Sequence, residues 1–177
     1  MQSMFTIYPF FLLAISIASA DLPDAVGPVI IIIFMVEFTY TKQEVAKVYE
    51  YILQNARISS IIFLHGEIGT GKTFLVSEFL KSQGITDPVT SPTFSIFKEY
   101  FLSKLNLKLF HYDLYRIKKP AELMFVDLEE NICEGMVLIE WPEIAREFGV
   151  KPTLEISIEY VNNDIDQNLY LRKCLVG

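Results

Sequence analysis

Eight consecutive residues constrain this chain more than any other feature, because they match the phosphate-binding pattern G-x-x-x-x-G-K-[ST]. They are Gly66-Glu67-Ile68-Gly69-Thr70-Gly71-Lys72-Thr73. The run 60–64 before them is apolar and rich in β-branched residues, which predicts a buried strand. The run 74–81 after them has apolar residues at helical spacing, and Gly84 is available to end a helix. Strand, glycine loop and helix in this order are the context that a P-loop requires.

The residue types in the loop predict how it would bind phosphate. Gly66, Gly69 and Gly71 permit backbone conformations that direct successive N–H groups at an anion, with no Cβ in the way. The partial positive charge at the start of the helix favours the same anion. Lys72 is expected to contact the β- and γ-phosphates, and Thr73 to supply a hydroxyl ligand for Mg²⁺. The alternative is a plain glycine-rich turn between strand and helix, which would not need Lys72 and Thr73 side by side. All eight residues are therefore predicted to bind ATP.

Length, charge and cysteine content narrow the possibilities. The 177 residues suit one domain with a substantial core. The formal net charge of −7 disfavours direct binding of nucleic acid, because basic side chains on phosphates supply most of that affinity. Cys133 and Cys174 lie far apart and show no metal-binding spacing, which indicates buried or inert thiols in a reducing compartment.

The first 34 residues differ from the rest of the chain, because they contain no Lys or Arg. Residues 4–20 resemble the apolar part of a signal peptide, but a positive n-region is missing and the run is short for a spanning helix. Three interpretations stay open: a spurious or dispensable extension before Met35, a membrane-attached N-terminus, and export. The first is favoured, because globular patterning begins after Met35 and ATP is a cytosolic substrate. Residues 35–177 are therefore expected to form a cytoplasmic ATPase domain without stable membrane association.

Beyond residue 35 the pattern alternates between helices and strands. Thr41 and Glu44 have the form of a capping box. The helix after them would bury one face, made up of Val45, Val48, Tyr49, Ile52 and Leu53. Strands are expected at 94–102, 105–113, 136–139, 153–160 and 168–175, with turns at 103–104 and 162–164 and a helix at 121–130. The pattern predicts a three-layer α/β domain of the P-loop NTPase type, with a central mostly parallel sheet and a C-terminal hairpin.

A P-loop needs an acidic partner at the end of a neighbouring buried strand, and two residues fit this position. Glu140 follows the apolar strand 136–139, and Asp113 ends the strand 105–113. The alternatives are a solvated carboxylate at a strand end for Glu140 and a turn-forming residue for Asp113. Given the P-loop, both are predicted to be catalytic, with Glu140 also a ligand of Mg²⁺.

Three further segments resemble those of one protein family. Val89-Thr90-Ser91-Pro92-Thr93-Phe94 is similar to the V-x-S-P-T-[FY] segment of the TsaE (YjeE) family. Residues 111–116 (HYDLYR) and 138–143 (LIEWPE) resemble its H-[FY]-D-L-Y-R and L-[IV]-E-W-P-[EQ] segments, in the family's order behind the P-loop. The resemblance covers about residues 36 to 160. It implies the bacterial ATPase of tRNA N6-threonylcarbamoyladenosine synthesis, which works with the TsaD–TsaB threonylcarbamoyl transferase.

The resemblance also implies roles for individual residues. Lys72 would be catalytic and hold phosphate, while Asp113 and Glu140 would be the catalytic or metal-linked acids. Ser91, Pro92 and Thr93 would form a switch-like loop near the γ-phosphate, so Thr93 is predicted to contact ATP.

Three other motif residues keep two interpretations each. Trp141 lies beside the site or is a rim aromatic that packs under a loop. Arg116 stabilises phosphoryl charge or pairs with Glu122 or Asp127. His111 contacts a ligand or a satisfied neighbour in the core, and the second is favoured.

The favoured function is an ATP-hydrolysing accessory protein of tRNA threonylcarbamoyladenosine (t6A37) modification. It would drive turnover of the transferase complex and meet tRNA only through that complex, in agreement with the acidic charge. Hydrolysis is expected to be slow alone, because Arg116 is the only arginine near the motifs. Two alternatives are a P-loop small-molecule kinase, which would usually carry more basic residues than 113–135 offer, and a non-catalytic nucleotide-dependent binding module.

Overall fold

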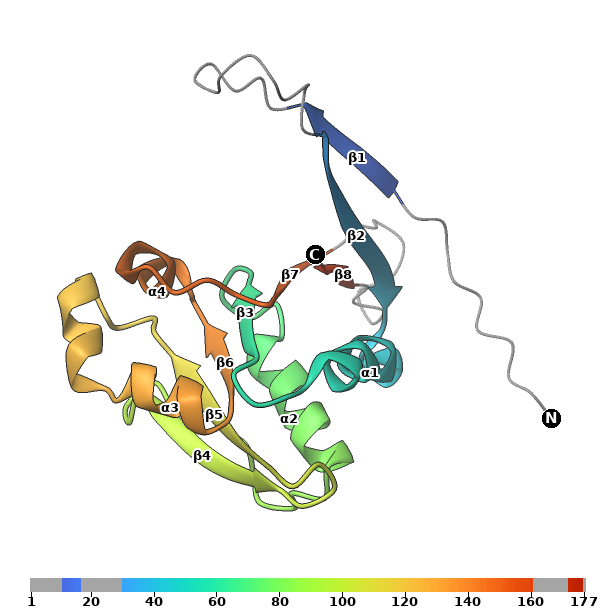
Figure 1. Cartoon of the computed structure of the whole chain (residues 1–177). Coiled ribbons are helices and arrows are strands. Elements are labelled where there is room, and N and C mark those ends of the chain that lie inside the picture. Colours follow the sequence, from blue (N-terminus) through green and yellow to red (C-terminus); the bar gives the residue numbers. More distant parts are fainter. Residues whose placement is uncertain (1–10, 17–29, 161–171, 177) are drawn as a thin grey trace, which may run out of the picture.

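The computed structural model describes residues 11–16, 30–160 and 172–176. Within these residues eight strands form one sheet in the order β1-β2-β8-β7-β3-β6-β5-β4 (Figure 1). The strands are β1 (Phe11–Ser16), β2 (Ile30–Tyr40), β3 (Ile61–His65), β4 (Phe97–Leu102), β5 (Leu107–Asp113), β6 (Met136–Glu140), β7 (Leu154–Tyr160) and β8 (Arg172–Val176). The helical segments are η1 (Lys42–Glu44), α1 (Ala46–Asn55), α2 (Lys72–Ser82), η2 (Pro120–Phe125), α3 (Leu128–Glu134) and α4 (Glu143–Phe148).

The centre of the sheet is parallel and its margins are antiparallel. β7, β3, β6 and β5 run in the same direction, whereas β4 pairs antiparallel with β5 at one edge. On the other side β8 and β2 continue the sheet in antiparallel pairs. The predicted α/β fold with a mostly parallel centre is therefore confirmed. The predicted C-terminal hairpin is also confirmed as the pair of β7 and β8, although its expected turn at 162–164 lies outside the described residues.

β2 is one continuous strand that crosses the predicted boundary at residue 35. Its first part, up to Met35, pairs with β1, and its second part, from Val36, pairs with β8. A domain that begins at residue 35 would keep all of the pairing between β2 and β8.

Helices lie on both faces of the sheet, which makes the domain three layers thick (Figure 1). Successive side chains of a strand point to opposite faces, and β3 follows this rule. Ile62 and Leu64 belong to the core cluster that includes residues of α1 and α2. Ile61 and Phe63 belong to the cluster with residues of η2, α3 and α4. Burying one such side chain contributes roughly 1.5–3 kcal/mol, so two packed layers hold the sheet on either side.

Both helices near the P-loop begin or end as the sequence predicts. The carboxylate of Glu44 accepts hydrogen bonds from the backbone N–H and the hydroxyl of Thr41, each at 3.1 Å, so this capping box begins the short segment η1, and α1 itself begins two residues later at Ala46. The expected face of this helix contacts the core, with Val45, Val48 and Ile52 buried and Tyr49 and Leu53 partly buried. α2 ends just before Gly84, whose positive φ of 94° allows the chain to turn away.

The strand predicted from 94 is shorter than expected and begins at Phe97. Ile96 has a φ of 66°, and its carbonyl accepts a hydrogen bond from the Asp113 N–H at 2.9 Å, which turns the chain out of the strand ladder. β5 likewise begins at Leu107, after a turn that extends over 103–106 with Asn106 at a positive φ of 50°.

The prediction of a single helix at 121–130 is wrong, because two short helical segments, η2 and α3, take its place. The break falls at Asp127, where φ is 51°. The preceding carbonyl, of Val126, accepts a hydrogen bond from the buried Tyr112 hydroxyl at 2.8 Å instead of one from a helical N–H. A contact with the sheet therefore interrupts a pattern that is locally helical.

Among the helices of the described residues, none combines the length and the apolar character needed to cross a membrane.

Candidate functional site

The candidate site forms at the carboxyl edge of the parallel strands, where ligands bind in open α/β sheets. Glu140, the last residue of β6, lies opposite Leu64 of β3 and opposite Asp113, the last residue of β5. The P-loop follows β3 directly. The sheet order β3-β6-β5 therefore brings both predicted acids to the loop.

The P-loop adopts a conformation that depends on its glycines. Gly66, Gly69 and Gly71 have φ values of 142°, 85° and 106°, which other residues rarely adopt. A Cβ at Gly66 would lie 2.5 Å from the Ile158 carbonyl oxygen and 2.7 Å from the Thr70 hydroxyl oxygen. The loop thus needs glycine at position 66 for space as well as for φ.

Lys72 lies at the start of α2, and its side chain is largely buried. Its Nζ donates to the carbonyl oxygens of Gly66 at 2.5 Å and Glu67 at 3.0 Å, and it lies 3.8 Å from the centre of the Trp141 ring. Burial lowers the pKa of Lys72, while the carboxylates of Glu140 and Asp113 act in the opposite direction. The ammonium group is therefore held inside the cleft by the loop and by an aromatic face.

Glu140 joins the P-loop helix to the sheet. The Thr73 hydroxyl donates to Oε2 of Glu140 at 3.0 Å, and Nε2 of His111 lies 2.9 Å from Oε1. Glu140 and His111 are both buried. His111 thus contacts a neighbour in the core, the favoured one of its two interpretations.

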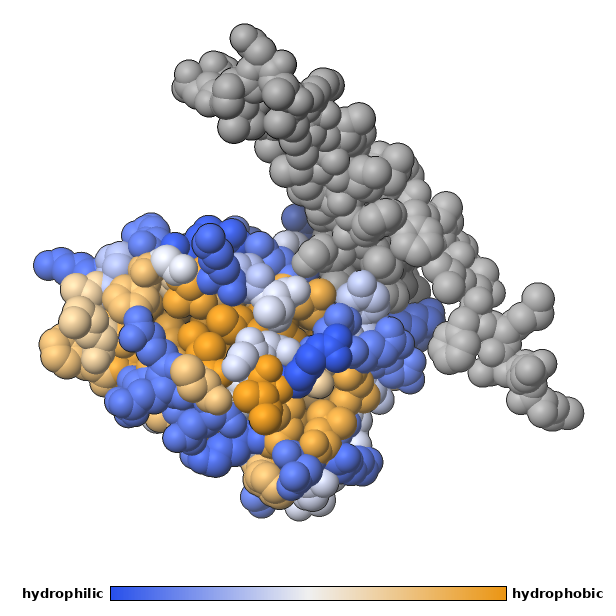
Figure 2. Space-filling model, in the orientation of Figure 1, coloured by the Kyte–Doolittle hydropathy of each residue, from blue (hydrophilic) through white to orange (hydrophobic). Residues whose placement is uncertain are grey.

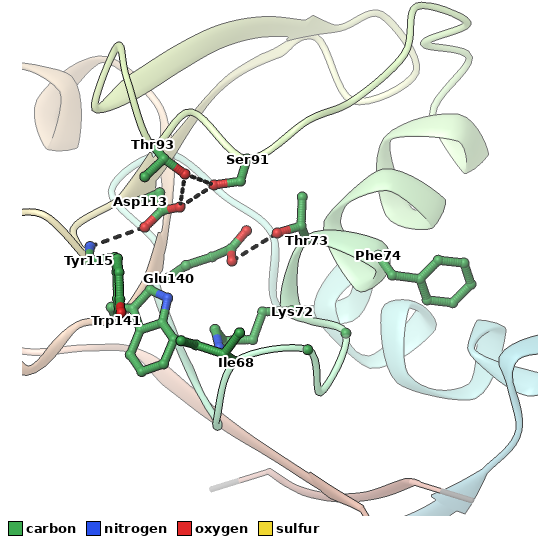
Figure 3. A pocket seen from close by; sticks show the side chains of 12 residues that line it. Ile68, Lys72, Thr73, Phe74, Ser91, Thr93, Asp113, Tyr115, Glu140 and Trp141 are labelled. Atoms are coloured by element: carbon green, nitrogen blue, oxygen red, sulfur yellow. Dashed lines mark hydrogen bonds between the residues drawn. The ribbon is translucent and has the colours of Figure 1, made fainter. Parts of the chain in front are cut away.

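Asp113 anchors the loop before β4 (Figure 3). Its Oδ2 accepts hydrogen bonds from the hydroxyls of Ser91 and of Thr93, the latter at 2.8 Å. Its Oδ1 accepts a bond from the backbone N–H of Tyr115 at 3.0 Å. Ser91 and Thr93, 20 or more residues away in sequence, therefore join the acid at the site.

Trp141 borders the site on the side opposite Thr93 (Figure 3). Its backbone has a φ of 59°, which is uncommon for a residue with a large side chain. Its ring lies 5.0 Å from the Tyr115 ring at an angle of 53°. Both interpretations of Trp141 therefore hold in part, since it lines the site and packs against a loop aromatic.

These side chains surround one open cleft of about 430 Å³. It is lined by Ile68, Gly69, Gly71, Lys72, Thr73, Phe74, Ser91, Thr93, Asp113, Tyr115, Glu140 and Trp141. Of the predicted loop residues, Glu67 contributes its carbonyl, which accepts hydrogen bonds from Thr70 and Lys72. Phe74 and Tyr115 line the cleft without having been predicted as site residues: Phe74 follows Thr73 directly, and Tyr115 lies within the motif 111–116.

The oxygen donors of this cleft fit Mg²⁺ better than a softer metal. Mg²⁺ is held by one or two carboxylates together with phosphates and water, and Thr73 and Glu140 supply a hydroxyl and a carboxylate at contact distance from each other. In the part of the chain that the structure describes, no cluster of three or more His, Cys, Asp or Glu side chains could hold a metal by itself. The donor set is consistent with an ion that reaches the protein together with a nucleotide.

Arg116 does not take the ion pairs considered for it. Within the described residues it pairs with neither Glu122 nor Asp127, and its guanidinium lies 4.1 Å from the centre of the Phe94 ring. One contact of the P-loop could not have been predicted from the sequence. The Tyr160 hydroxyl at the end of β7 donates to the Gly69 carbonyl at 2.5 Å, across 91 positions of sequence.

The fold and this site define a P-loop protein of the nucleotide-binding class, with the loop between β3 and α2 and an acid at the end of β6. A family model described as "Threonylcarbamoyl adenosine biosynthesis protein TsaE" matches residues 39–169. The chain belongs to the TsaE family.

Individual relatives agree with this assignment. The tRNA threonylcarbamoyladenosine biosynthesis protein TsaE of Rickettsia conorii is 34% identical over 125 residues, which cover 70% of each chain. The protein of the same name from Bacillus subtilis is 35% identical over 109 residues, 62% of this chain and 67% of the relative. The crystal structure of Bacillus subtilis YdiB matches with a TM-score of 0.61 and 25% identity, over 80% of this chain and 84% of the other.

Proposed function

We propose that this chain binds ATP with Mg²⁺ in the cleft and hydrolyses it, as an accessory protein of threonylcarbamoyl transfer to tRNA. The observation that carries the proposal is the hydrogen bond between the Thr73 hydroxyl and Glu140. It joins the residue that ends the P-loop to the acid that ends β6, the two donors that a nucleotide-bound magnesium ion requires. Membership of the TsaE family supports the pathway.

Each residue of the cleft has a distinct part in this proposal. The loop N–H groups and Lys72 would bind the phosphates, for which Lys72 would exchange its bonds to the loop carbonyls. Thr73 and Glu140 would hold Mg²⁺, which offsets negative charge on the phosphate oxygens when it is bound. Thr93 would lie near the terminal phosphate because Asp113 holds its hydroxyl at the cleft.

Asp113 would orient the attacking water and at the same time position the loop that contains Ser91 and Thr93. Its two oxygens already accept three hydrogen bonds, so any group that competes for Asp113 also shifts this loop. The proposal therefore couples the nucleotide state to the position of the loop 91–93.

Hydrolysis by the chain alone should be slow. Lys72 is the one basic side chain among the residues that line the described cleft, and no arginine accompanies it. An added arginine accelerates related phosphoryl transfers by roughly 10³–10⁵, so a partner could supply a large stimulation.

Exposed apolar side chains next to the cleft support a protein partner. Ile68 lines the cleft and is 70% exposed, and Phe94, next to Thr93, is 87% exposed. Figure 2 shows hydrophobic and hydrophilic side chains interspersed on the face in view. We propose the TsaD–TsaB transferase as this partner. The net charge of −7 supports contact with tRNA only through that complex.

The working unit in the proposal is 35–177, in the cytoplasm and without stable membrane association. The pairing of β2 with β8 from Val36 onward supports this boundary, because among the described strand pairs a chain cut at residue 35 loses those between β1 and β2.

The test is phosphate release by the full chain and by 35–177, each alone and with purified TsaD–TsaB. Lys72→Ala removes the loop lysine, and Lys81→Ala is its matched control on the exposed side of α2. The expected result is slow release that the partners stimulate, lost in Lys72→Ala and kept in Lys81→Ala. Fast release indifferent to the partners, or no release from a folded protein, would contradict the proposal.

Two further outcomes identify the alternatives. Transfer of phosphate to a metabolite instead of water would identify a small-molecule kinase. Unchanged function of the transferase complex with Glu140→Ala and Asp113→Ala, both still binding ATP, would identify a non-catalytic binding module.

A further inference from the structure

His111 has a buried polar atom that the fold leaves without a partner. In the described part of the chain, its Nδ1 is the buried side-chain nitrogen or oxygen for which no hydrogen bond is found. The ring is fully buried in β5. Burying an unpaired polar atom is unfavourable, so an apolar side chain would suit this position better if packing alone decided it.

The direction of the ring follows from the alternation of the strand. Leu109, His111 and Asp113 are two residues apart along β5 and so lie on one face. Leu109 packs in the cluster that includes α2, as does Leu138 two residues before Glu140 on β6. His111 and Glu140 therefore face the helix that begins at the P-loop.

Among the described residues, the side chain of His111 makes one hydrogen-bonding contact, with Glu140. Nε2 lies 2.9 Å from Oε1 of the carboxylate, while Thr73 occupies Oε2. An ionised carboxylate only accepts hydrogen bonds, so Nε2 carries a proton in this contact. The carboxylate is thus held at both oxygens, by the P-loop helix on one side and by β5 on the other.

We propose that His111 is a positioning residue that orients the Glu140 carboxylate toward Thr73 and Mg²⁺. This inference rests on the proposed function, because it requires Glu140 to hold the ion. Groups that orient a metal-binding side chain typically change metal affinity or activity by about 10- to 100-fold when they are removed. His111 is not among the residues that line the described cleft, and its side-chain hydrogen bond goes to Glu140, so its effect would pass through that carboxylate.

The experiment compares His111→Leu with His111→Gln in the full chain. Leucine fills the space without a donor, whereas the glutamine amide places a donor at about the distance of Nε2. Calorimetry measures the affinity of AMP-PNP over a range of Mg²⁺ concentrations, and the affinity of ADP in EDTA. The expected result is a half-maximal Mg²⁺ concentration raised about 10- to 100-fold in His111→Leu and restored to within a few-fold in His111→Gln. The ADP affinity without metal should change by less than about twofold.

A second readout is ¹⁵N NMR of the side chains of His65 and His111, the two histidines of the chain. His65→Gln identifies which signals belong to His111. The expected form of His111 is the tautomer protonated at Nε2. A ring protonated only at Nδ1 overturns the proposal, because it could not donate to Glu140.

The outcomes separate this inference from the function on which it rests. If the wild-type chain binds AMP-PNP equally with and without Mg²⁺, the proposed function fails and the inference fails with it. If the wild type depends on Mg²⁺ and His111→Leu needs the same concentration, only the role of His111 is refuted. An equal loss of metal-free ADP affinity in His111→Leu also refutes it, since the residue would then be merely structural. If His111→Leu does not fold, His111→Asn takes its place, because its amide is too short to reach Glu140. Equal Mg²⁺ requirements of His111→Asn and His111→Gln would then refute the role.

Discussion

Gly66→Ala is expected to destabilise the protein more than Gly69→Ala, although both glycines belong to the P-loop. Both have positive φ values, 142° and 85°. A Cβ at Gly66 would lie 2.5 Å from the Ile158 carbonyl oxygen, far inside the 3.4 Å at which ordinary van der Waals contact begins. A Cβ at Gly69 would have nothing within 4 Å.

The two costs can be separated. Positive φ in the left-handed region strains an L residue by about 1–2 kcal/mol, and the φ of 142° at Gly66 lies beyond that region, so Gly66→Ala carries at least the backbone cost of Gly69→Ala. The Ile158 oxygen belongs to the backbone of β7 and cannot rotate away, so Gly66→Ala adds an overpacking cost of about 1–3 kcal/mol. For a protein of this size each kcal/mol lowers Tm by roughly 2–4 °C. Gly66→Ala should therefore melt about 2–12 °C below Gly69→Ala.

The assay is thermal and urea unfolding without added nucleotide, so that ligand binding does not contribute. Gly84→Ala is the matched control outside the loop, because its φ is 94° and its Cβ would also have nothing within 4 Å. It should resemble Gly69→Ala. If all three variants have the same Tm and the same urea midpoint, the close approach of β7 to Gly66 does not determine stability and the reasoning is refuted.

Three other predictions concern catalysis and stability. Glu140→Gln should lower kcat for ATP hydrolysis by about 100-fold or more while nucleotide affinity stays within about tenfold, measured by phosphate release and calorimetry. Hydrogen bonds from Lys47 and from the Thr41 N–H lower the pKa of Glu44 to about 2. A lowered pKa stabilises the fold above the ordinary value of 4.5, and this stability is lost as the pH falls toward 2. The wild type should thus exceed Glu44→Gln in stability by about 0.5–1 kcal/mol at pH 7, since the site is exposed. In urea melts this difference should shrink only as the pH falls from about 4.5 toward 2. Tyr112→Phe should cost about 1–3 kcal/mol in urea unfolding, because the buried Asn131 amide, 2.6 Å from the hydroxyl, loses its acceptor.

Each of these predictions has a result that contradicts it. Undiminished hydrolysis by Glu140→Gln would exclude that carboxylate from catalysis. A stability difference between wild type and Glu44→Gln that is constant from pH 7 to pH 2 would show that ionised Glu44 is not its source. Unchanged stability of Tyr112→Phe would mean that water or another group satisfies the Asn131 amide.

The local elements around the P-loop could be predicted because their causes are local. An apolar β-branched run, glycines that permit positive φ, and apolar residues at helical spacing are all properties of neighbouring residues. The same holds for the capping box of Thr41 and Glu44, whose atoms are three residues apart. The position of Glu140 at a strand end also followed from its own strand.

The elements that were predicted wrongly depend on distant contacts. The pattern at 121–130 is helical by itself, but Tyr112, on a strand of the sheet, binds the Val126 carbonyl and interrupts it. The strand expected from 94 is shortened because Ile96 turns out of the ladder beside Asp113. Neither contact can be predicted from the residues next to it in the sequence.

The sequence by itself determined the class of the protein, since the P-loop, its helix and the two acids each lie within a short contiguous motif. Only the tertiary structure decided how these motifs meet. Thr73 reaches Glu140 across 67 positions, and the hydroxyl of Tyr160 reaches Gly69 across 91. The physical reason is that the order β3-β6-β5 is a property of the whole packed sheet, whereas backbone conformation and turn chemistry belong to a few residues at a time.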